Sequence, residues 1–145
     1  AKWQVPYILM HSRGDSKTMQ SLTNYDNVVL EVASELSDKI AVLKEKGVKD
    51  IIIDPGFGFA KTQEQNFEVL NHLDFFQSFG RPMIVGVSRK GMIYNKLNTN
   101  EAEALNGTTI VNTVAAIKGA NILRVHDVIE AKEIATLLND SVLNT

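Results

Sequence analysis

The chain has 145 residues, no cysteine, a formal net charge of −2, and 44% hydrophobic and 22% charged residues. These values predict a globular domain with a substantial core, and give no reason to expect a nucleic acid or a membrane surface as a partner. No apolar run approaches the roughly 18 residues of a membrane span. Without cysteine, disulfides, zinc–thiolate sites and a cysteine nucleophile are excluded, which fits a cytoplasmic protein.

The start of the chain carries no recognisable secretory signal. It lacks a charged segment followed by a long apolar core, and the first residue is Ala1 rather than Met. The apolar run at residues 5–10 already has the character of a strand. We therefore expect the chain to belong to a longer protein or to have been processed.

Four apolar segments, each followed by polar residues, predict four β-strands. In chain order they cover residues 5–10, 51–53, 83–87 and 122–123. Helices are expected between and after them, at residues 27–46, 64–79 with a break, 101–118 and 128–139. Gly47, Gly80 and Gly119 stand where a helix would end in the left-handed conformation that glycine adopts without steric cost.

The periodicity also predicts a core and a fold class. The side chains expected to point inward are Val28, Leu36, Ile40 and Leu43 in the first helix and Ile134, Leu137 and Leu138 in the last. Continuous apolar strands are typical of parallel sheets covered on both faces. Residues 1–145 therefore read as one α/β segment of four consecutive βα units. Such a segment is either a small open domain or half of an eight-stranded barrel, which needs about 250 residues.

The unusual polar residues all follow the predicted strands. They are His11 and Arg13, Asp54, Ser88 to Lys90, and Arg124 to Asp127. Because the carboxyl ends of parallel strands meet at one edge, we expect these residues to gather at one mouth. His72 falls in a helical segment and is expected at the surface.

Asp54 opens the stretch Asp-Pro-Gly-Phe-Gly-Phe. A carboxylate at a strand end can accept two hydrogen bonds from adjacent N–H groups of a planar heterocycle, and Phe59 could form a flat wall beside it. A turn with a capping aspartate is the alternative. The residues alone leave both readings open.

The other polar residues suggest an anion site. Lys90 is expected in the mouth, whereas Arg89 is expected to make a structural ion pair or to be solvated. Arg124 and His126 should share a strand face as a clamp for phosphate or pyrophosphate. No Ser-His-Asp arrangement is predicted, because Ser88 has no identified base. Gly86 removes a side chain where another group must come close.

Four ordered motifs carry a family resemblance: LMHSRG with KTMQ, IDPGFGFAKT, VGVSRK and ILRVHDV. From about Pro6 to Leu138 the chain resembles the C-terminal half of a bacterial dihydropteroate synthase. The resemblance implies a (β/α)8 TIM barrel that joins 6-hydroxymethyl-7,8-dihydropterin diphosphate to p-aminobenzoate in folate biosynthesis. The products are 7,8-dihydropteroate and pyrophosphate.

The resemblance also implies roles for individual pocket residues. Asp54 would hydrogen-bond the pterin ring, and Lys90 would reach it from the other side. Met10 and Gly86 would line the pterin pocket. Phe59 would lie where pterin and p-aminobenzoate meet, with Lys90 also near the latter.

The remaining implied roles concern the leaving group. Arg124 would stack over the pterin and, with His126, hold the diphosphate. The catalytic set would thus be Asp54, Lys90, Arg124 and His126. The family uses Mg²⁺ bound mainly through the diphosphate, so no metal ligand is expected from this half. Gly91 stands where the family often has serine near the aminobenzoate carboxylate, so a hydroxyl contact is lost there.

The resemblance also implies that the family's barrel contains strands that this chain lacks. The first four strands of the barrel are absent, so we expect an incomplete site when the chain is alone. The full-length protein would be a homodimer and a sulfonamide target, and the small-residue segment at residues 107–120 would pack either within the chain or between subunits. Two alternatives are a pterin-binding methyltransferase domain and a non-catalytic pterin-binding paralogue.

Overall fold

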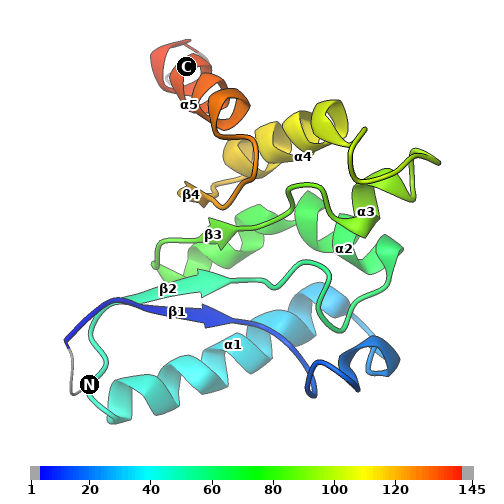
Figure 1. Cartoon of the computed structure of the whole chain (residues 1–145). Coiled ribbons are helices and arrows are strands. Elements are labelled where there is room, and N and C mark those ends of the chain that lie inside the picture. The colour runs from blue at the N-terminus through cyan, green and yellow to red at the C-terminus, as the bar shows by residue number, and fades with distance from the viewer. Residues whose placement is uncertain (1–3, 142–145) are drawn as a thin grey trace.

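A computed structural model describes residues 4–141, with side chains up to residue 138 (Figure 1). Strands and helices alternate along the chain, as the sequence predicts. The elements are β1 (Tyr7–Met10), η1 (Met19–Ser21), α1 (Val28–Glu45), β2 (Ile51–Asp54), α2 (Gln63–Asn71), η2 (Leu73–Phe79), β3 (Ile84–Val85), α3 (Gly91–Tyr94), α4 (Leu105–Ile117), β4 (Ile122–Leu123) and α5 (Val128–Ser141).

The four strands lie side by side in chain order and all run parallel (Figure 1). β1 pairs with β2, with Met10 opposite Asp54. A single bridge from Ile53 to Met83 joins β2 to the start of the β3 segment, and β3 pairs with β4. Because all four strands run parallel, their carboxyl ends lie on the same side of the strands.

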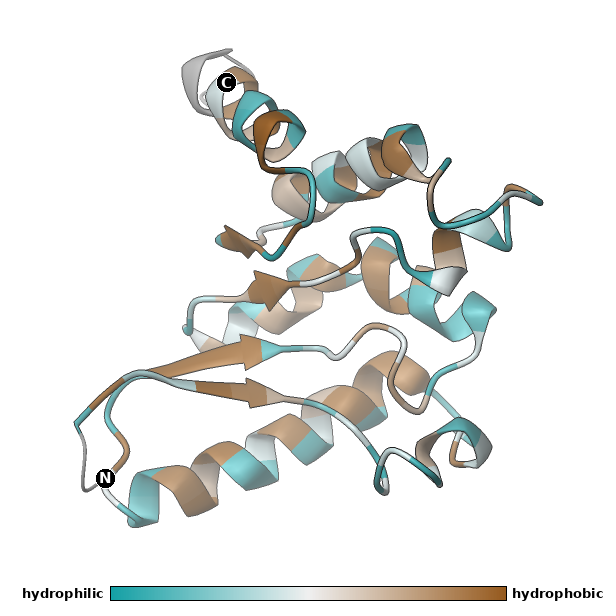
Figure 2. Ribbon diagram, in the orientation of Figure 1, coloured by the Kyte–Doolittle hydropathy of each residue, from teal (hydrophilic) through white to brown (hydrophobic). Residues whose placement is uncertain are grey.

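The two faces of β1 and β2 differ in burial because strand side chains alternate. Ile51 and Ile53 are 1% and 0% exposed and belong to the same core as Leu36 of α1. Ile8, on the opposite face, is 51% exposed. Figure 2 shows all four strands as hydrophobic. The face that carries Ile8, Met10 and Asp54 is therefore the one on which a site can form.

The predicted elements are confirmed, with differences at their ends. β1 and β3 are shorter than predicted, β2 extends one residue further, to Asp54, and β4 has the predicted bounds. The break in the second helix falls at His72, between α2 and η2. Gly47, Gly80 and Gly119 have φ of 79°, 57° and 98°, so the predicted left-handed helix ends are present.

The prediction that Leu137 points inward is wrong. Leu137 is 67% exposed, whereas Ile134 is 6% exposed. The reason is that α5 packs mainly against α4, which covers only one side of the helix. None of the helices within residues 4–141 has the length and apolar character needed to cross a bilayer.

Candidate active site at the strand ends

Asp54 ends β2 and is the buried centre of the site, with 2% exposure. Its Oδ1 accepts a hydrogen bond of 2.8 Å from the Gly56 backbone N–H. Its Oδ2 lies 3.7 Å from a guanidinium nitrogen of Arg124. Burial raises the pKa of Asp54, and the Gly56 N–H, Arg124 and Lys90 oppose that rise. An ionised Asp54 thus depends on the cations around it.

The turn at residues 55–60 shapes the wall next to Asp54. Gly56 has φ of 73°, and a Cβ there would lie 1.9 Å from the carbonyl oxygen of His11. Glycine is required at this position both by the backbone angle and by the close approach. The His11 N–H in turn donates to the Asp54 carbonyl at 2.9 Å. Asp54 therefore does more than cap a turn, because it stands where the ends of β1 and β2 are closely joined.

Lys90 reaches the same region from the segment after β3. Its Nζ donates to the Phe57 carbonyl oxygen and lies 4.9 Å from the centroid of the Phe59 ring. Burial and the nearby Arg124 lower the pKa of Lys90, whereas Asp54 raises it. The predicted position of Lys90 in the mouth agrees with this geometry, and its neighbour Phe59 is half-buried.

The Arg124 guanidinium lies close to Gly86. A Cβ on Gly86 would lie 2.7 Å from Nη2 and 2.8 Å from Nε of Arg124. The Arg124 backbone N–H donates to the Val85 carbonyl at 2.8 Å, which extends the β3–β4 ladder. The group that comes close at Gly86 is thus the guanidinium itself, which lies across β3 toward Asp54.

Ser88 and His126 form a pair that the sequence analysis missed. The Ser88 Oγ lies 2.9 Å from His126 Nδ1 and accepts the His126 backbone N–H at 3.2 Å. Ser88 is 4% exposed. The statement that Ser88 has no identified base is therefore wrong. Strand register was the available signal, because both residues stand three positions after the register pair Val85–Leu123.

Of the two alternatives for Arg89, solvation and a structural ion pair, the structure shows the ion pair. The Arg89 guanidinium donates to both carboxylate oxygens of Asp127, with 2.9 Å from Nη2 to Oδ1 and 3.0 Å from Nε to Oδ2. Arg89 also donates to the carbonyls of Glu101 and Ala102. Asp127 is thereby occupied by Arg89. The hydrogen bonds from Arg89 lower the pKa of Asp127.

His11 and Arg13 do not join the mouth, contrary to the expectation for them. His11 is fully buried, and its Nε2 lies 3.1 Å from Glu35 Oε2. Arg13 donates to the carboxylates of Glu31 and Glu35 on α1. Both residues follow β1 as predicted, but their side chains pair with Glu31 and Glu35 of α1. Another cation, Lys61, was missed and is buried beside His11.

The other residues singled out from the sequence are Met10, Gly91 and His72. Met10 stands opposite Asp54 in the β1–β2 register and is half-buried. Gly91 is the first residue of α3, where a Cβ would lie 3.2 Å from Asn95 Nδ2 and 3.5 Å from the Tyr94 hydroxyl. His72 is exposed, as predicted.

Metal binding was tested against the donor groups present. Among the described residues, no three His, Cys, Asp or Glu side chains are grouped so that they could hold a metal ion. The described residues thus do not fit a magnesium site made by protein ligands alone, since Mg²⁺ prefers several oxygen ligands in octahedral geometry.

The geometry defines a class of protein. Parallel strands end here in a buried carboxylate, beside two cations and an aromatic ring, and such groups could accept hydrogen bonds from a planar N–H-bearing heterocycle and contact an anion linked to it. The family model described as "Pterin binding enzyme" matches residues 1–126. The chain belongs to this family.

Within this family, the chain is similar to several dihydropteroate synthases. The chain is 41% identical over 135 residues to the dihydropteroate synthase of Escherichia coli (strain K12). The matched region covers 92% of the chain and 48% of the relative. A Yersinia pestis dihydropteroate synthase in complex with a sulfonamide drug is 34% identical, with a TM-score of 0.92 over 96% of the chain and 52% of its own. A Xanthomonas albilineans dihydropteroate synthase with 4-aminobenzoic acid is 34% identical, with a TM-score of 0.89 over 96% and 50%. The chain thus spans about half the length of these relatives.

Proposed function

We propose that this chain is the C-terminal half of a dihydropteroate synthase barrel. The observation that carries the proposal is the convergence of Asp54, Lys90 and Arg124 at the ends of three neighbouring strand segments. One buried carboxylate suits the paired N–H groups of a pterin, and the two cations suit its carbonyl and its diphosphate. The relatives with 4-aminobenzoic acid and a sulfonamide bound support p-aminobenzoate as the second substrate.

The proposed reaction is a displacement at the methylene carbon of the pterin. The C–O bond to the diphosphate breaks, pyrophosphate departs with the electron pair, and the amine nitrogen of p-aminobenzoate forms the new C–N bond and loses a proton. Asp54 and Lys90 orient the pterin. Arg124 and His126 stabilise the charge that develops on the leaving pyrophosphate. No covalent intermediate with the enzyme is needed.

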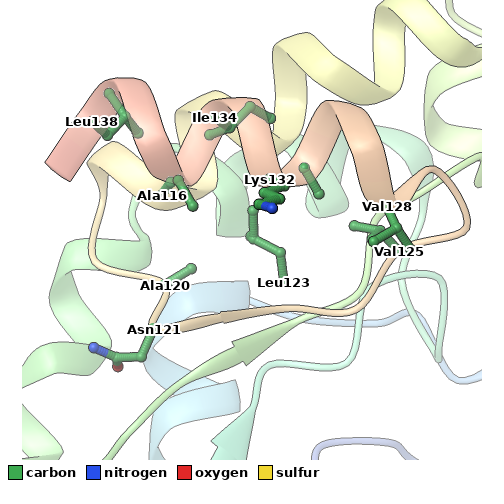
Figure 3. Close-up of a pocket in the computed structure, with 11 residues that line it drawn as sticks. Ala116, Ala120, Asn121, Leu123, Val125, Val128, Lys132, Ile134 and Leu138 are labelled. Atoms are coloured by element: carbon green, nitrogen blue, oxygen red, sulfur yellow. The ribbon is translucent and has the colours of Figure 1, made fainter. Parts of the chain in front are cut away.

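The two outer strands support the view that this is half of a barrel. On β1, Tyr7 and Ile8 are 47% and 51% exposed, and on β4 Ile122 is 39% exposed. Beside β4 lies an open, mostly apolar groove between α4 and α5 (Figure 3). Its lining includes Ala116, Leu123, Val125, Val128, Ile134 and Leu138. We propose that the first half of the barrel covers both strand edges and this groove.

The remaining expectations extend this proposal. Mg²⁺ would enter with the substrate diphosphate. The full-length protein would be a cytoplasmic homodimer and a sulfonamide target. For residues 107–120, close packing within the chain is supported at Gly107, where a Cβ would lie 2.5 Å from Ile93 Cγ2.

The test is turnover by the full-length protein. Pterin diphosphate, p-aminobenzoate and Mg²⁺ should give dihydropteroate and pyrophosphate in equal amounts. Pterin binding without turnover would favour the non-catalytic paralogue. Methyl transfer from methyltetrahydrofolate to a corrinoid would favour the methyltransferase domain, and absence of pterin binding would exclude all three readings.

A further inference from the structure

Lys61 is a buried cation that has no part in the proposed reaction. It is 4% exposed, and its Nζ lies 2.9 Å from His11 Nδ1, 3.0 Å from the Gly56 carbonyl oxygen and 3.2 Å from that of Phe59. Three acceptors match the three N–H bonds of an ammonium group. Since Lys61 donates to Nδ1, the His11 proton is on Nε2, from which it is donated to Glu35.

The turn that Lys61 holds includes an alanine with an unfavourable backbone angle. Gly56, Gly58 and Ala60 all have positive φ, of 73°, 78° and 50°. Ala60 carries a side chain in a region that favours glycine, and it is fully buried. Such a turn persists only where its surroundings fix it. Lys61 bonds two of its carbonyls, and the Tyr25 hydroxyl bonds a third, that of Ala60, at 2.9 Å.

The same turn carries the groups that shape the pocket. The Gly56 N–H donates to Asp54, the Phe57 carbonyl accepts from Lys90, and the Phe59 ring lies beside the Lys90 ammonium. Lys61 contacts the turn from the α1 side, away from these groups. A shift of the turn would therefore move several pocket groups together.

We propose that Lys61 is a positioning residue for pterin binding, which fixes the turn at residues 55–60 and supplies a positive charge behind Asp54 without touching the substrate. This inference rests on the proposed function. The charged groups that interact with Lys61 include Asp54, Glu35, Arg13 and Lys90, and those that interact with Asp54 include Arg124, Lys90 and Lys61. Removal of Lys61 leaves Asp54 with fewer cations, so its carboxyl should protonate at higher pH.

The experiment compares variants of the full-length protein in calorimetric titrations with a pterin analogue across a range of pH. Lys61→Met should weaken binding by about tenfold or more near pH 6, below the Lys61 pKa of about 7, because it removes buried charged hydrogen bonds. It should also move the acidic limb of the binding curve to higher pH. Lys44→Met, at an exposed position on α1, should match the wild type in both respects.

A second variant separates the charge of Lys61 from its support of the turn. Tyr25→Phe removes the hydrogen bond to Ala60 but no charge, so it should weaken binding without moving the acidic limb. Lys61→Gln retains an N–H donor and replaces Lys61→Met if that variant does not fold. If neither folds, saturating pterin should still shift the Lys61 ammonium resonance in wild-type protein labelled with ¹⁵N-lysine, and an unchanged resonance would overturn the proposal.

Two failures can be distinguished. Wild-type pterin affinity and an unmoved acidic limb in a folded Lys61 variant would refute the role of Lys61 alone. If wild type and Lys44→Met both fail to bind pterin, the proposed function itself is wrong.

Discussion

At the scale of single residues, the site depends on groups that are costly to bury and are therefore matched to partners. Asp54 is balanced by a backbone N–H, Arg124 and Lys90. His126 is held by Ser88, and Arg89 is engaged by Asp127 and by two backbone carbonyls. These pairings separate the cations available to a substrate from those that hold the fold.

Asp54→Asn tests the pterin contact. The amide keeps the shape of the side chain, but it replaces a charged acceptor and presents an N–H group where an acceptor is needed. We expect a loss of about 1.5–3 kcal/mol in binding free energy, or roughly tenfold to a hundredfold in affinity, measured by calorimetry with a pterin analogue. Asp38→Asn, at an exposed position of α1, is the control and should leave affinity unchanged.

Ser88→Ala tests the orientation of His126. The Ser88 hydroxyl accepts the His126 backbone N–H, so its proton is free to be donated to Nδ1, which leaves Nε2–H to face an anion. Without the Ser88 hydroxyl, the binding free energy for the pterin diphosphate should weaken by about 0.5–1.5 kcal/mol. The affinity for a pterin without diphosphate should stay the same. Equal losses for both ligands would contradict this role. Ser37→Ala is an exposed control.

At the scale of the elements, close approaches decide how the βα units fit together. Arg124 of the segment after β4 lies across β3 because Gly86 has no side chain. In the same way, α4 approaches α3 closely because Gly107 faces Ile93 and Leu97. Both glycines therefore act in packing between elements, and neither has a positive φ.

Gly107→Ala tests the second contact. Alanine favours a helix by about 1 kcal/mol over glycine, so propensity alone predicts stabilisation. A Cβ at 2.5 Å from buried Ile93 Cγ2 opposes this, and overpacking typically costs about 1–3 kcal/mol. We expect a net loss of stability in urea unfolding of the full-length protein. Asn106→Ala, at an exposed position of α4, should not be destabilising, and a stabilised Gly107→Ala would show that α3 can move away.

At the scale of the whole molecule, buried titratable groups connect α1 to the site. Burial and the nearby Lys61 lower the pKa of His11 from 6.5 to about 4, and burial lowers the pKa of Lys61 to about 7. Glu35 links His11 to Arg13 on the outer side. The packing of β1 against α1 thus depends on a neutral His11.

Acidification should therefore destabilise the fold. Between about pH 6.5 and 4 the unfolded chain binds a proton at His11 that the folded chain does not, so the free energy of unfolding falls as pH falls through this window. Urea unfolding of the full-length protein at several pH values measures the slope. His11→Asn removes the titrating group and should flatten the curve, whereas an unchanged slope would assign it to other groups.

The two open strand edges predict how the chain behaves by itself. Exposed apolar edges promote association between chains. We expect the isolated chain to self-associate in size-exclusion chromatography with light scattering, and to form a defined one-to-one complex when co-expressed with the first half of the Escherichia coli relative. Ile8→Lys, on the exposed face of β1, should reduce the self-association. A stable monomer that ignores the added half would contradict the half-barrel proposal.

The sequence by itself determined the order of the elements and the strand ends that carry Asp54, Lys90 and Arg124. These features follow from local periodicity and from motifs within single βα units, which the neighbouring residues encode. The helix ends at Gly47, Gly80 and Gly119 were predictable for the same reason.

Only the tertiary structure decided which side chains meet. It placed His11 and Arg13 with α1, joined Ser88 to His126, assigned the space at Gly86 to Arg124, exposed Leu137 and buried Lys61 beneath the turn. Each outcome depends on distances between elements that are far apart in the chain. Local sequence fixes where a charged residue stands along its own strand, but the partner that offsets the cost of its burial comes from another element.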